Sequence, residues 1–101
     1  MIIEVFEKNG KYVVLDENLK EISNKWTNEI GEILGFSSEA IVCEKNDKYY
    51  VYDEDFREIC NVWSSQIGKY KHITGGFILC HKNNKRYVYD LKFREKANQW
   101  I

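Results

Sequence analysis

The sequence predicts an all-β fold made of three 37-residue antiparallel meander repeats. Three observations support this prediction: a fixed repeat period, turn-forming residue pairs at the same place in each copy, and aromatic and β-branched runs beside those turns. Blocks starting at Val5, Val42 and Leu79 are spaced 37 residues apart, and consecutive blocks agree at 13 of 22 positions. A unit this small cannot bury its apolar face alone, so the copies must pack on one another.

The length of 101 residues suits a single domain. We divide it into three repeats at residues 1–38, 39–75 and 76–101. The third copy stops soon after its tryptophan, so we expect about two and two-thirds units.

The middle copy shows the predicted elements in order. Ile41–Glu44 is a first strand, and Asn46-Asp47 then forms a tight hairpin turn because these residues tolerate positive φ. The equivalent pairs are Asn9-Gly10 and Asn83-Asn84. Lys48–Tyr52 is a second strand, since aromatic and β-branched residues fit a pleated surface. Asp53 opens the next turn, where its side chain can accept bonds from backbone amides just ahead.

The segment after that turn has two interpretations. Phe56, Ile59 and Trp63 are spaced 3 and 4 residues apart, as on one face of a helix. In a strand, Ile59, Asn61 and Trp63 would instead occupy one face by simple alternation. We favour strands at Arg57–Trp63 and Lys69–Ile73, which complete a four-stranded meander. An α+β fold of ββα repeats is the alternative.

The end of the second strand carries a family resemblance. Tyr52-Asp53 and Tyr89-Asp90 follow a hairpin with a polar turn, and Leu15-Asp16 is a weaker version. This pattern resembles a β-propeller blade of the WD-repeat or quinoprotein-like kind. The resemblance implies propeller blades, and because three incomplete units are too few, it implies closure by a second chain to give six blades. A threefold β fold such as a trefoil is the other possibility.

Charge is balanced overall, with 15 basic and 16 acidic residues and a net charge of −1. This balance excludes a strongly basic nucleic-acid binder and an acidic mimic of DNA unless the charges are segregated. The first hairpin tips hold a basic set: Lys8, Lys11, Lys45, Lys48, Lys82, Lys85 and Arg86. The second turns hold an acidic set: Asp16, Glu17, Asp53, Glu54, Asp55 and Asp90. Successive turns of a meander lie at opposite ends of its strands, so we expect one basic and one acidic face.

Aromatic residues recur at fixed places in the repeats. Because a buried tryptophan contributes a large apolar area, we predict that Trp26, Trp63 and Trp100 form structural core between units. A set of sugar-binding pockets is the alternative for these three residues. The aromatic interface candidates are Tyr49, Tyr50 and Tyr87, from strands whose side chains alternate between the two faces. Asn24, Asn61 and Asn98 are predicted to bond the backbone at a turn or bulge.

No arrangement of residues points to catalysis. Cys43, Cys60 and Cys80 form an odd set without CxxC spacing, and the histidines, His72 and His81, do not recur in every copy. No nucleophile elbow or phosphate-binding loop is present, so we predict no enzyme, no metal and no cofactor. With no export signal or apolar span, reduced thiols indicate a cytoplasmic protein.

These features favour a non-catalytic protein-binding module. A small inhibitor or immunity factor acting on a toxin or a defence nuclease would be of this type. Nucleic-acid or anion binding through the lysine-rich tips is the first alternative, because exposed tyrosines can stack on bases beside those tips. Lectin-like sugar binding at the tryptophans is the second.

Overall fold

The computed structural model describes residues 1–101. Eleven strands form three antiparallel sheets, and two one-turn helices lie between the sheets along the chain. Sheet 1 comprises β1 (Glu4–Lys8), β2 (Lys11–Leu15) and β3 (Glu21–Trp26). Sheet 2 comprises β4 (Glu32–Phe36), β5 (Ile41–Lys45), β6 (Lys48–Tyr52) and β7 (Glu58–Trp63). Sheet 3 comprises β8 (Lys69–Thr74), β9 (Phe77–Lys82), β10 (Lys85–Asp90) and β11 (Glu95–Trp100). The predicted all-β class and its meander repeats are confirmed.

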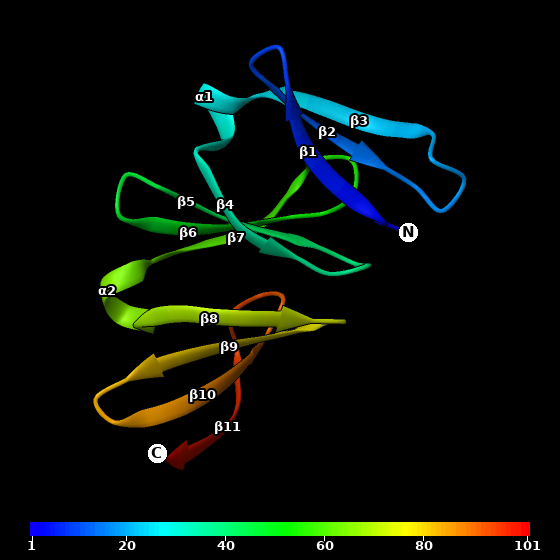
Figure 1. Ribbon diagram of the computed structural model, residues 1–101. Helices are drawn as coiled ribbons and strands as arrows, with labels where there is room; N and C mark the ends of the chain where they lie inside the picture. Colours follow the sequence, from blue (N-terminus) through cyan, green and yellow to red (C-terminus); the bar gives the residue numbers. More distant parts are fainter.

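The sheets lie in an open row that follows the chain (Figure 1), with overall dimensions of 41 × 27 × 19 Å. The one-turn helices α1 (Thr27–Ile30) and α2 (Ser64–Ile67) connect consecutive sheets and lie on the same side of the row. Neither helix is long enough to cross a membrane.

Both kinds of predicted turn are present. Asn46 and Asp47 have φ of 52° and 64°, and Asn83 and Asn84 have nearly the same values, as a two-residue hairpin turn with two left-handed residues requires. At the second turns, Asp53 Oδ1 accepts bonds from the backbone amides of Asp55 (2.8 Å) and Arg57 (2.9 Å). Asp16 and Asp90 accept the equivalent bonds in sheets 1 and 3.

The second turns also contain an unexpected conformation. Leu19, Phe56 and Phe93 adopt φ of 59°, 57° and 56°, a region that bulky side chains rarely occupy. The strain is offset in two copies, because Phe56 and Phe93 are buried between sheets. Leu19, at the equivalent place in sheet 1, is 69% exposed.

The predicted fourth strand joins a different sheet from the one expected. Lys69–Thr74 forms β8 as predicted, but it pairs with β9 and opens sheet 3 instead of completing sheet 2. The connection explains this course: α2 follows β7 directly, and Gly68, with φ of 96° and ψ of −158°, then turns the chain from α2 into β8. The ββα alternative is wrong, because the segment after the second turn is a strand followed by only one helical turn.

Two apolar cores lie between neighbouring sheets. The core between sheets 1 and 2 contains Ile2, Val14, Ile30, Ile41, Cys43, Tyr52 and Phe56. The core between sheets 2 and 3 contains Ala40, Val42, Tyr49, Val51, Ile67, Ile73, Ile78, Cys80, Tyr89 and Phe93. Sheet 2 therefore has both faces covered, whereas sheets 1 and 3 each have one covered face.

Candidate binding surface at the hairpin tips

The three tryptophans lie at the surface, not in the cores. Trp26, Trp63 and Trp100 are 50%, 51% and 68% exposed, so the prediction that they form structural core is wrong. Each is the last residue of β3, β7 or β11, the strand at the free edge of its sheet. An edge position beside a hairpin tip lies outside the contact between sheets, which explains the exposure.

Each tryptophan ring is covered on one face by a lysine of its own sheet. Strand register pairs Lys11 with Trp26, Lys48 with Trp63 and Lys85 with Trp100. The lysine Nζ atoms lie 4.5, 4.5 and 4.4 Å from the ring centroids, within the range of a cation–π contact. We call these six residues the Trp–Lys ridge. The pairs restrict the tryptophan side chains while leaving half or more of each exposed.

The remaining basic candidates have other contacts. Lys45 Nζ donates to the carbonyl of Glu29 at 3.1 Å, and Lys82 Nζ donates to that of Gln66 at 3.0 Å. These carbonyls belong to α1 and α2, so both lysines tie a hairpin tip to the helical turn before it. Lys8 is the equivalent residue of sheet 1, which no helical turn precedes. Arg86 lies on β10, where its guanidinium contacts Gln99 Oε1 at 3.5 Å.

The tyrosine candidates divide between the core and the surface. Tyr49 is only 5% exposed, and its hydroxyl donates to the carbonyl of Gly68 at 2.6 Å, so its prediction as an interface residue is wrong. The prediction failed because sheet 2 is packed on both faces, which leaves no solvent side for alternating residues of β6. Tyr50 and Tyr87 are half-buried.

The repeated asparagines also differ from the prediction. Asn24, Asn61 and Asn98 donate through Nδ2 to the glutamate carboxylate three residues earlier, at 2.7 to 2.8 Å. They therefore brace the edge strands through side-chain bonds and do not bond the backbone of a turn.

Charge around the ridge changes along the row of sheets. In sheets 1 and 2, Glu7 and Glu44 pair with Tyr12 and Tyr49, one position along the strands from the ridge lysines, and Asp47 lies in the hairpin turn of sheet 2. In sheet 3, His81 occupies the place of Glu7 and Glu44. Desolvation lowers the pKa of His81 below its usual value, and the charges of Lys71, Arg86 and Lys69 lower it further. The ridge thus has mixed charge over two sheets and a basic neighbourhood over the third.

An open groove of about 670 Å³ lies beside Trp63, where sheet 2 passes to sheet 3. Its lining is mostly polar: Glu44, Asp47, Tyr49, Trp63, Ser64, Ser65, Gly68 and Lys69. Donors, acceptors and an aromatic ring are therefore available together in the middle of the ridge.

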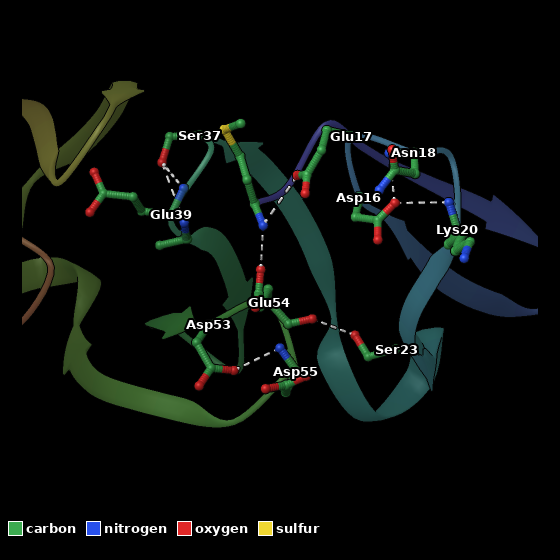
Figure 2. Close-up of polar contacts among 12 residues, drawn as sticks. Asp16, Glu17, Asn18, Lys20, Ser23, Ser37, Glu39, Asp53, Glu54 and Asp55 are labelled. Carbon is green, nitrogen blue, oxygen red and sulfur yellow. Dashed lines mark hydrogen bonds and ion pairs between the residues drawn. The ribbon is translucent and has the colours of Figure 1, made fainter.

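The acidic turns of sheets 1 and 2 lie side by side (Figure 2). The N-terminal ammonium of Met1 contacts the carboxylates of Glu54 at 2.9 Å and Glu17 at 3.6 Å. These contacts raise the pKa of the ammonium, with the Glu54 hydrogen bond as the main cause. Ser23 Oγ donates to the carbonyl of Glu54 at 2.6 Å, so this end of the strands is bound together by polar contacts.

The cysteines lie in or beside the cores. Cys43 and Cys80 are buried in different cores, and Cys60 is half-buried. Burial raises the pKa of Cys43 and of Cys80 to about 12 and that of Cys60 to about 11. No group of three or more His, Cys, Asp or Glu side chains that could hold a metal is present.

Comparison of the chain with protein-family models, with curated proteins and with solved structures finds no match.

Proposed function

We propose that the protein is a non-catalytic binding module that recognises another protein through the Trp–Lys ridge. The observation that carries this proposal is the repetition of an exposed tryptophan under a lysine in all three sheets. Tryptophan is enriched among the residues that dominate protein interfaces. Because each ring is already held by its lysine, less side-chain entropy is lost on binding.

The charges beside the ridge favour a protein partner over a nucleic acid. A phosphate backbone needs a continuous row of cations, but Glu44 and Asp47 interrupt the row at sheet 2. Lys45 is bonded to the carbonyl of Glu29, which reduces its freedom to contact phosphate. A surface of alternating donors, acceptors and aromatic rings suits a protein surface of mixed polarity. An inhibitor or immunity factor would use such a surface to cover its target.

We also propose that the three sheets are propeller blades. The last strand of each sheet leads to the first strand of the next through α1 or α2, as from the outer edge of one blade to the inner edge of its neighbour. The Tyr52-Asp53 and Tyr89-Asp90 pairs stand at the ends of β6 and β10, the strands that follow the hairpins with polar turns, which supports the resemblance. In this arrangement the ridge occupies one rim of the assembly.

Binding of single-stranded nucleic acid is the second candidate, and it is favoured by sheet 3 alone. There Lys69, His81 and Arg86 are cross-strand neighbours on β8, β9 and β10, one position along the strands from the Lys85–Trp100 pair and on the other face of the sheet. Stacking of a base on Trp100 with phosphate contacts from these cations would give modest affinity that falls steeply with added salt.

The test compares the wild type with a variant in which all three tryptophans are alanine. The control is Phe36→Ala, which truncates a 37% exposed aromatic at the end of β4 away from the ridge. Immobilised wild type and control should retain the same protein from nuclease-treated extract. The triple variant should lose it, since truncating one dominant tryptophan costs about 2 kcal/mol, or about 30-fold in Kd.

Circular dichroism of the three proteins establishes that the variants are folded. Equal retention by the triple variant would overturn the proposal. Loss of retention on nuclease treatment, together with a steep salt dependence, would instead favour the nucleic-acid candidate.

A further inference from the structure

The two contacts between neighbouring sheets are the same contact made twice. Sheet 2 packs on sheet 1 with Cys43, Tyr52 and Phe56, and sheet 3 packs on sheet 2 with the residues 37 positions later, Cys80, Tyr89 and Phe93. The polar contacts repeat as well. Ser23 Oγ donates to the carbonyl of Glu54 at 2.6 Å, and Cys60 Sγ donates to that of Leu91 at 3.2 Å.

One half of this contact lies on the face of sheet 1 that points away from sheet 2. We call it the outer face of sheet 1, formed by Glu4, Phe6, Val13, Leu15 and Leu19. Glu4 and Leu19 are exposed, Phe6 and Leu15 are half-buried, and Val13 is only 8% exposed. Phe6, Leu15 and Leu19 stand at the places of Cys43, Tyr52 and Phe56. Leu19 is 69% exposed, although its equivalents Phe56 and Phe93 are only 4% and 8% exposed. Leu19 thus stands where Phe56 and Phe93 pack against the preceding sheet, but no sheet of this chain lies against it.

The other half is exposed on sheet 3. The outer face of sheet 3 is formed by Leu79, His81, Arg86, Val88, Ala97 and Gln99. Leu79 and Val88 stand at the places of Val42 and Val51, which lie in the core between sheets 2 and 3. A hollow of about 330 Å³ lies on this face, between Leu79, Val88 and Ala97. On sheet 2 the equivalent place is filled by the turn of sheet 3 that contains Leu91 and Phe93.

The two outer faces carry opposite charge where they depart from the repeat. Glu4 on sheet 1 replaces the fully buried Ile41 and Ile78, and Glu17 lies in the adjoining turn (Figure 2). On sheet 3, Arg86 replaces Tyr12 and Tyr49, and Lys96 replaces Ile22 and Ile59. These opposite charges attract one another, while Lys8 and Lys11 stand at the other end of the sheet 1 face.

We propose that copies of this chain associate head to tail, with the outer face of sheet 1 of one copy on the outer face of sheet 3 of another. Leu19 enters the hollow between Leu79, Val88 and Ala97, as Phe93 enters between sheets 2 and 3. Such a contact is heterologous, so it uses a different surface on each copy. Leu19 lies in the turn before β3, and Trp26 is the last residue of β3 on the same face of the sheet. A variant at Leu19 therefore changes the end of this face that is remote from the ridge.

Two variants each remove one half of the contact. Leu19→Lys places a charge on the inserting residue, and Ala97→Glu places a carboxylate on the rim of the hollow, facing the acidic partner. Both positions are exposed, so neither change should unfold the chain. Asn28→Lys, on the exposed surface of α1 and outside the groove beside Trp63, is the control for added charge.

Sedimentation velocity at protein concentrations up to about 1 mM gives the result, since weak contacts with millimolar Kd are detected there. The wild type and Asn28→Lys should form dimers or larger species, and each interface variant alone should be monomeric. A mixture of the two variants should form a 1:1 dimer, because Leu19→Lys keeps an intact sheet 3 face and Ala97→Glu an intact sheet 1 face. A monomeric wild type would overturn the proposal. An associated wild type whose two variants stay monomeric when mixed would also overturn it.

Discussion

Replacing Gly68 with alanine perturbs the point at which the chain passes from sheet 2 to sheet 3. Gly68 has φ of 96° and ψ of −158°, a region that essentially only glycine occupies. An added Cβ would stand 2.5 Å from the carbonyl oxygen of His81 and 2.7 Å from Cβ of Lys82, both on β9. Backbone strain of about 1–3 kcal/mol and overpacking of about 1–3 kcal/mol add to an expected loss of about 2–6 kcal/mol. That is a large part of the 5–15 kcal/mol typical of a whole domain.

Gly10→Ala separates strain from close packing. Gly10 has φ of 79°, but the nearest atom to its added Cβ is a Trp26 ring carbon at 4.0 Å. We expect this control to lose only about 1–2 kcal/mol, the usual penalty for alanine in a left-handed conformation. Urea unfolding followed by circular dichroism gives both values. The reasoning is refuted if Gly68→Ala costs no more than Gly10→Ala, because the close approach to β9 would then contribute nothing.

Three further predictions follow from the cores and turns. Phe93→Ala should lower the free energy of unfolding in urea by about 3–5 kcal/mol, because the Phe93 ring is buried. Leu19→Ala, at the same place in sheet 1, should lower it by less than about 0.5 kcal/mol. Equal losses would contradict the conclusion that Phe93 is core and Leu19 is surface. Iodoacetamide at pH 8 should leave Cys43 and Cys80 unmodified until urea is added, since burial raises the pKa of each to about 12; rapid labelling of folded protein would disprove this. Hydrogen bonds from backbone amides lower the pKa of the Asp90 carboxyl from 3.8 to about 2. The stability that this carboxylate contributes is therefore full above pH 4 and is lost as the pH falls toward 2. The stability of Asp90→Asn should depend less on pH over that range, as thermal unfolding at several pH values would show.

Local features of the fold could be predicted from the sequence because they depend on residues close together in the chain. Asn46-Asp47 requires a turn that tolerates positive φ, and Asp53 lies where its carboxylate reaches the next amides. The strand at Lys48–Tyr52 follows from its aromatic and β-branched residues. None of these depends on which other strand lies alongside.

The sheet to which each strand belongs could not be predicted in the same way. A repeat of 37 residues defines the content of a unit but not the point at which one unit ends and the next begins. Lys69–Thr74 follows β7 at the end of one copy and precedes β9 at the start of another, and both pairings preserve the period. Only the backbone direction at Gly68 decides between them.

The candidate site was predicted in part for a similar reason. Trp63 and Lys48 are 15 residues apart, and the register of β6 and β7 brings them together. The repetition of the tryptophan marked it as important, but burial depends on contact between sheets, which repetition does not specify. Tyr49 failed in the opposite direction, because a second sheet covers the face that a single sheet would expose.

Departures from the repeat distinguish sheets 1 and 3 from sheet 2 better than the repeat itself does. Ser23 and Cys60 donate a bond to the turn of the following sheet, and Ala97 at the same place has no donor and faces no following sheet. Tyr12 and Tyr49 donate to the carbonyls of Gly31 and Gly68, and Arg86 replaces them in sheet 3. Strand formation does not require these changes, since all three copies form the same strands. The residue types at these positions instead affect the contacts between sheets. Substitutions here are therefore expected to strengthen or abolish head-to-tail association without altering the fold of a sheet.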